Sequence, residues 1–126
     1  MELEELRVYN LSMELGELVY KTVESWTYFD KDTVGKQIVR SADSVAANIS
    51  EGFGRYFYKE TIKFAYYSRG SLFETKTFVQ KAHTRNLMSD TDHEKLLQMI
   101  EQIGKMLNSY INALHKLVDQ NEKNKK

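Results

Sequence analysis

Basic and aromatic residues are interleaved in the middle of the chain, between residues 53 and 69. Aromatic rings stack on nucleic-acid bases, and cationic side chains beside them contact phosphates. The segment therefore predicts a contact with RNA or DNA. Its basic residues are Arg55, Lys59, Lys63 and Arg69, and its aromatic residues are Phe53, Tyr56, Phe57, Tyr58, Phe64, Tyr66 and Tyr67.

The spacing of the basic residues suggests how they would be presented. Arg55, Lys59 and Lys63 are four residues apart, so on a helix they would form one ridge that could follow a phosphate backbone. Arg40 adds a further basic residue from the preceding segment.

A structural role for the same residues stays open at this point. Phe64, Tyr66 and Tyr67 could fill the core or a subunit contact, which would leave the basic residues merely solvated. Arg40 could form an ion pair with Asp43 or Glu51.

Catalytic chemistry finds little support. His83, His93 and His115 are far apart, cysteine is absent, and no helix repeats the Glu-x-x-His pattern of a di-iron bundle. Asp90-x-x-His93 is the nearest approach to a metal motif, and Asp90 reads better as a helix cap. We expect a protein that is not an enzyme, with no metal and no cofactor.

A distinctive stretch, Asn-Ile-Ser-Glu-Gly-Phe-Gly-Arg, spans residues 48–55. It follows an apolar stripe of helical spacing, made by Ile38, Ala42, Val45 and Ile49. Gly52 and Gly54 are predicted to end that helix by adopting a positive φ.

Several residues near this stretch are predicted to have structural roles. Asn48 and Glu51 fall near the end of the helix, where a carboxylate is mildly unfavourable. We expect Glu51 to pair with Arg55, Arg69 or free backbone donors, and Glu74 to pair with Arg69, Lys76 or a neighbouring helix.

Glycines inside the expected helices need a packing reason, because each costs about 1 kcal/mol relative to alanine. For Gly16, Gly70 and Gly104 we expect the close approach of another helix, inside the bundle or across a subunit contact.

Periodicity predicts four helices. They cover roughly residues 5–28, 34–53, 57–86 and the region from residue 91 onward. Asp30, Asp32 and Thr33 offer caps for the second helix, and Thr91-x-x-Glu94 is a capping-box pattern for the fourth. The chain has no proline, and the connections are short. The fold class is therefore all-α, an antiparallel up-down-up-down four-helix bundle.

The chain of 126 residues suits a single domain over residues 1–126, with a polar tail from about residue 120 to 126. The acidic start does not resemble a signal peptide, and no apolar run approaches membrane-spanning length. With no cysteine, the sequence favours a cytoplasmic location and no membrane partner.

Charge is unevenly distributed although the whole chain is neutral. Residues 1–32 carry eight acidic and three basic residues, whereas residues 36–85 carry four acidic and nine basic residues. Such asymmetry allows either an anionic partner or a head-to-tail homo-oligomer, although solvated bundle faces would account for it too.

The motifs also support a family resemblance. Over nearly its whole length the chain resembles the four-helix-bundle family encoded by intervening sequences in bacterial 23S rRNA genes, often labelled ribosomal protein S23. The likeness rests on the segments 37–40, 44–55, 59–64 and 68–74. It departs at Ala46, Ser50 and Thr75, where relatives commonly carry proline, alanine and leucine.

The resemblance carries expectations of its own. It implies a homo-oligomer, a pentamer, with a connection to nucleic acid and no established catalytic chemistry. The bundle is also similar to the accessory variability protein of diversity-generating retroelements, which associates with a reverse transcriptase. A structural ring that docks a protein partner such as a reverse transcriptase is therefore the alternative to nucleic-acid binding.

Overall fold

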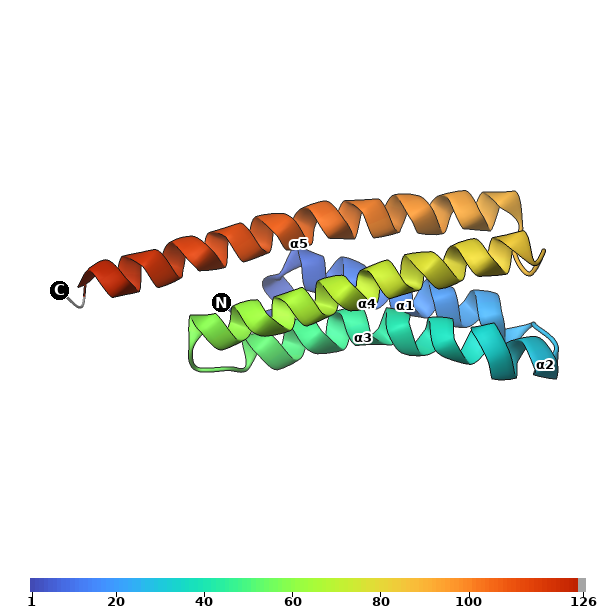
Figure 1. Cartoon of the computed structure of the whole chain (residues 1–126), viewed down its shortest axis with the longest axis horizontal. Coiled ribbons are helices and arrows are strands. Elements are labelled where there is room, and N and C mark those ends of the chain that lie inside the picture. The colour runs from blue at the N-terminus through green and yellow to red at the C-terminus, as the bar shows by residue number, and fades with distance from the viewer. Residues whose placement is uncertain (125–126) are drawn as a thin grey trace.

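The computed structural model describes residues 1–124. Four long helices run alternately up and down, and each packs against its neighbours in a closed bundle (Figure 1). The predicted all-α, antiparallel four-helix bundle is confirmed. The long helices are α1 (Arg7–Glu24), α3 (Lys36–Phe53), α4 (Tyr58–Thr84) and α5 (Asp90–Asn124), and the short turns are η1 (Leu3–Glu5), α2 (Tyr28–Asp30) and η2 (Lys31–Gly35).

The connection between the first two long helices differs from the expectation. Helix α1 ends at Glu24, and a continuous helical run begins at α2, where the Asp30 backbone N–H donates to Thr27 Oγ1 at 3.3 Å. The run then passes through η2, a π-helical turn, into α3. The predicted caps at Asp30, Asp32 and Thr33 are wrong, because helical bonding has already begun at Thr27.

The cap of the last helix also lies elsewhere. Helix α5 begins at Asp90, and the Asp92 backbone N–H donates to Ser89 Oγ at 3.1 Å. Ser89 therefore caps α5, and the predicted capping box of Thr91 and Glu94 is wrong. The backbone turns sharply just before this point, at Asn86, whose φ is 61°.

The core follows the predicted stripe of α3 closely. Ile38, Ala42, Val45 and Ile49 are all buried, and they meet Leu15 and Val19 of α1 in one cluster. Helix α5 contributes its own alternating row to the same cluster, from Leu96, Ile100, Ile103 and Leu107. Burial of such side chains drives the four helices together.

Gly52, at the end of α3, is required by the closeness of α4 and not by its φ. No glycine in residues 1–124 has a positive φ, so that prediction for Gly52 and Gly54 is wrong. A Cβ at Gly52 would lie 2.8 Å from Phe64 Cβ and 3.1 Å from the Thr61 carbonyl oxygen. Gly52 therefore allows α4 to approach the end of α3 closely.

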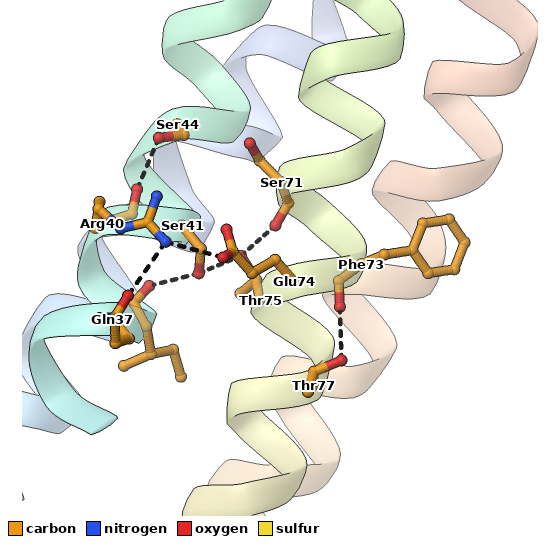
Figure 2. A network of polar contacts seen from close by, with 10 residues as sticks. Gln37, Arg40, Ser41, Ser44, Ser71, Phe73, Glu74, Thr75 and Thr77 are labelled. Atoms are coloured by element: carbon orange, nitrogen blue, oxygen red, sulfur yellow. Dashed lines mark hydrogen bonds and ion pairs between the residues drawn. The ribbon is translucent and has the colours of Figure 1, made fainter. Parts of the chain in front are cut away.

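Buried hydroxyls join α3 to α4. Ser68 Oγ donates to the Val45 carbonyl oxygen at 2.7 Å. Thr75 Oγ1 donates to Ser41 Oγ at 3.0 Å, as Figure 2 shows. Across residues 1–124, no buried side-chain nitrogen or oxygen lacks a hydrogen-bond partner. The seam between α3 and α4 is thus made of small, satisfied side chains.

The far end of α5 extends beyond the other helices (Figure 1). Residues 120–124 of the expected polar tail continue this helix, and residues 125 and 126 lie outside the described part of the chain. Within residues 1–124, no helix is both long enough and apolar enough to cross a bilayer. The expectation of a single domain stays a prediction.

Candidate nucleic-acid interface

Arg55 lies at the corner between α3 and α4, next to an aromatic ring of α4. Its guanidinium carbon lies 4.8 Å from the centre of the Phe64 ring. The same guanidinium is 2.6 Å from Glu51 Oε1, which confirms the predicted pairing of Glu51. Arg55 is therefore held in place by one carboxylate and one ring.

Two further side chains continue this contact along α4. The rings of Phe64 and Tyr67 meet edge to face, with centres 5.5 Å apart. Lys63 Nζ lies 5.9 Å from the Tyr67 ring centre. We call Arg55, Lys63, Phe64 and Tyr67 the aromatic-basic face. The side chain of Tyr67, in its centre, is 49% exposed.

The predicted basic ridge of three residues on one helix is present only in part. Arg55 precedes the start of α4 at Tyr58, so it does not share a helix with Lys59 and Lys63. Lys59 Nζ instead lies 3.1 Å from Glu122 Oε1 of α5. Lys59 and Lys63 thus remain one turn apart on α4, while Arg55 lies before that helix and Lys59 is paired with α5.

The outer side of α4 exposes further rings. Tyr66 is 46% and Phe73 is 58% exposed, and the Arg69 guanidinium lies 5.8 Å from the Phe73 ring centre. The idea that Tyr66 and Tyr67 fill the core of one chain is wrong, whereas Phe64 is half-buried. A subunit contact stays open for these rings.

Gly70 lies between these exposed rings on α4. No atom lies within 4 Å of where its Cβ would be, so packing inside the bundle does not explain the glycine. Gly16 does fit the packing prediction, since its Cβ would lie 2.7 Å from Asp43 Oδ1 of α3.

Arg40 is not part of the aromatic-basic face. Its Nη2 donates to Glu74 Oε2 of α4 at 2.9 Å and to Gln37 Oε1 at 3.2 Å (Figure 2). The predicted pairing with Asp43 or Glu51 is wrong, because the guanidinium crosses to α4. For Glu74, the predicted partner on a neighbouring helix is confirmed.

The remaining motif residues have local roles. Asn48 Nδ2 donates to the Ser44 carbonyl oxygen one turn earlier, at 2.9 Å. Asp43 faces α1, where partial burial and the nearby Glu17 carboxylate raise its pKa above the ordinary value. These residues shape the bundle, and neither contacts the aromatic-basic face.

The sequence did not predict a contact between His83 and His93. The rings of His83 and His93 stack with centres 3.8 Å apart, His83 Nε2 is 2.6 Å from Asp90 Oδ1, and His93 Nε2 is 2.7 Å from Gln80 Oε1. Asp90 is thus a partner of His83 and not the cap of α5. In residues 1–124, no group of three or more His, Asp or Glu side chains is arranged to hold a metal ion.

The fold is shared with a solved structure. The chain is similar to a protein of unknown function from the S23 ribosomal protein family of Bacteroides thetaiotaomicron, with 23% sequence identity and a TM-score of 0.74. The likeness covers 82% of this chain and 97% of the other. A comparison with the curated proteins gave no match. The profile of the family described as "23S rRNA-intervening sequence protein" matches residues 4–109, and the chain therefore belongs to that family.

Proposed function

We propose that this protein is not an enzyme and that it associates with RNA through the aromatic-basic face. The observation that carries the proposal is the exposed Tyr67 ring, which lies between the Lys63 ammonium and the Phe64 ring over which Arg55 is held. Such a ring accepts a stacked base, and the adjacent cations contact the phosphates on either side of it.

The chemistry favours unpaired RNA over duplex. Stacking on a side chain requires a base that is free of its helix, as in a loop, a bulge or a single strand. The family's description names an intervening sequence of 23S rRNA, so RNA is the nucleic acid to test before DNA. A cytoplasmic location would bring the protein together with such RNA.

The test is fluorescence anisotropy with a labelled single-stranded RNA of about 12 nucleotides, titrated over salt. In the variant, Arg55, Lys63 and Tyr67 are all changed to alanine. We expect the affinity to fall at least about tenfold, and the salt slope to flatten by roughly 1.4 because two phosphate contacts are lost.

A matched control removes the same charge and one tyrosine elsewhere. Lys95 and Lys116 are exposed on α5, and Tyr28 is 81% exposed at the other connection. Changing these three to alanine should leave RNA affinity unchanged. Equal losses in both variants, or no binding by the unchanged protein at low salt, would contradict the proposal.

A second candidate is a contact between copies of the chain. Gly70 faces open space between Tyr66 and Phe73, and a mid-helix glycine costs about 1 kcal/mol, which the close packing of another chain would offset. We propose that this patch joins copies into a homo-oligomer. The pentamer number comes from the family resemblance alone.

Light scattering of Gly70→Leu against the unchanged protein tests this contact. We expect the unchanged protein to be an oligomer and the variant to dissociate. If the unchanged protein is a monomer, the contact between copies is wrong. If an immobilised, purified reverse transcriptase instead retains the oligomer, the alternative function as a docking protein is favoured.

A further inference from the structure

A pocket opens between α1 and the start of α3, on a part of the molecule that the proposed RNA surface does not use. Its volume is about 370 Å³, and its walls come from Tyr20, Val23 and Glu24 of α1, from η2, and from Val39 and Arg40 of α3. Small-molecule sites have volumes of roughly 300–1,000 Å³. The pocket is large enough for one small ligand.

The π-helical turn gathers cations at this pocket. In η2 the Lys36 backbone N–H donates to the Lys31 carbonyl oxygen, five residues earlier. Residues five apart point about 140° away from each other on an ordinary α-helix, and the wider π turn reduces that angle. Arg40 follows Lys36 by four residues and shares its face. Lys31, Lys36 and Arg40 all line the pocket as a result.

The floor of the pocket is fixed by a close approach of α1 and η2. A Cβ at Gly35 would lie 2.9 Å from Val23 Cγ1 and 2.9 Å from the Asp30 carbonyl oxygen. Val23 and Gly35 are buried at this contact. The apolar floor is therefore formed by the packing of the bundle itself.

These cations are only partly neutralised, because Arg40 is paired with Glu74 and Lys36 weakly with Asp32. Within the described part of the chain, Lys31 forms no ion pair, and Lys36 Nζ is 3.8 Å from Asp32 Oδ1 with both side chains largely exposed. Arg40 donates to Glu74 and Gln37 through Nη2, and these two bonds leave its other guanidinium nitrogens available to a ligand. Glu24 is the one carboxylate that lines the pocket. A dianionic group would be attracted here.

We propose that this pocket binds a nucleoside monophosphate. The phosphate would accept charge-assisted hydrogen bonds from Lys31, Lys36 and Arg40. The base would pack on Tyr20 and on the apolar wall of Val23 and Val39. Glu24 would accept a hydrogen bond from a ribose hydroxyl or an exocyclic amine. The ligand is either a free nucleotide or the phosphorylated 5′ end of an RNA.

The site is independent of the aromatic-basic face. Arg40 and Arg55 are separated by roughly 20 Å along the axis of α3. Loss of RNA binding by the Arg55, Lys63 and Tyr67 variant would leave this pocket intact, and loss of the pocket would leave that face intact.

The first experiment is titration of the isotope-labelled protein with adenosine 5′-monophosphate, followed in two-dimensional NMR spectra of the backbone amides. We expect shifts at residues 20–24 and 31–40, and affinity at least about tenfold weaker for adenosine, which lacks the phosphate. The double variant Lys31→Ala, Lys36→Ala should weaken binding at least about tenfold, and Tyr20→Ala should weaken it as well.

Matched controls separate the pocket from general charge. The double variant Lys95→Ala, Lys116→Ala loses the same charge on α5, and it should bind the nucleotide as the unchanged protein does. The substituted lysines are exposed, and far-ultraviolet circular dichroism checks that each variant is folded. Unchanged nucleotide affinity in folded Lys31→Ala, Lys36→Ala would overturn the proposal.

A second pair of ligands distinguishes the two sources of the phosphate. A short RNA is prepared with either a 5′-phosphate or a 5′-hydroxyl and titrated against the Arg55, Lys63, Tyr67 variant. Tighter binding of the phosphorylated RNA than of the nucleotide assigns the site to RNA ends, and the reverse assigns it to a free nucleotide. If neither ligand shifts the pocket amides, the proposal is wrong.

Discussion

The two faces of α4 invert the usual arrangement of side-chain size. The face toward α3 carries the buried small side chains Ser68 and Thr75, whose hydroxyls bond to α3. The outer face carries Tyr66, Tyr67 and Phe73, each close to half exposed or more.

The difference separates what the fold needs from what it leaves free. Small residues on the inner face let the backbones of α3 and α4 approach closely, so folding depends on their size. Large rings in water contribute little to the fold, and such exposed apolar groups mark interaction surfaces. Substitutions on the inner face should therefore change stability, and substitutions on the outer face should change binding.

The largest contrast is expected between two glycines. Gly52→Ala should lower the free energy of unfolding by about 1–3 kcal/mol, because its Cβ would overlap Phe64 Cβ. Gly70→Ala should raise that free energy by about 0.5–1 kcal/mol in the dissociated single chain, at a dilution where copies do not associate, because its Cβ meets nothing within 4 Å there. Urea denaturation of both variants checks the signs. A loss of stability in Gly70→Ala would break the comparison.

A smaller contrast is expected between two threonines of α4. Thr75→Val removes the buried donor to Ser41 Oγ and the Ser71 carbonyl oxygen, and it should cost about 1 kcal/mol. Thr77 is exposed and bonds only within its own helix, to the Phe73 carbonyl oxygen (Figure 2). Thr77→Val should change the free energy of unfolding by less than about 0.5 kcal/mol. Equal losses of stability for the two variants in thermal unfolding would contradict the claim that stability depends on the side chains facing α3.

The ion pair that connects the two helices should contribute less still. Arg40 and Glu74 are about half exposed, so a double-mutant cycle with alanine at both positions should give a coupling of about 0.2–1 kcal/mol. The coupling should fall with added salt. A salt-independent coupling above roughly 2 kcal/mol would mean that this pair belongs to the buried seam.

The smallest effect on stability is expected from the His83–Asp90 pair near the end of α4, and it should appear only at low pH. The hydrogen bond and charge of His83 lower the pKa of Asp90. The unfolded chain then binds a proton at higher pH than the folded one, so this stabilisation is present above about pH 3.9 and is lost as the pH falls further. Asp90→Asn should make unfolding less dependent on pH in that range. An unchanged pH profile would exclude the pairing in solution.

The bundle could be predicted because its signals repeat. The α3 stripe of Ile38, Ala42, Val45 and Ile49 recurs at helical spacing, and all four residues are buried. The π turn could not be predicted in the same way. One extra residue within a helical run leaves both neighbouring stripes intact, so periodicity does not reveal it.

The site could be predicted only in part. The interleaved basic and aromatic residues indicated the surface of α4. Two ion pairs could not be foreseen: Arg40 pairs with Glu74, 34 residues away, and Lys59 pairs with Glu122 at the far end of the chain. Sequence spacing carries no signal for such pairs. Gly52 also shows the limit, since a turn and a close helix contact both favour glycine.

Ultraviolet cross-linking to RNA, read out by mass spectrometry, tests the central claim most directly. The unchanged protein would be irradiated with single-stranded RNA and the linked residues identified. The account predicts cross-links to Phe64 and Tyr67, with few to Tyr28, although Tyr28 is more exposed than either ring. Cross-links that avoid residues 55–67 would show that the outer face of α4 is not the RNA surface.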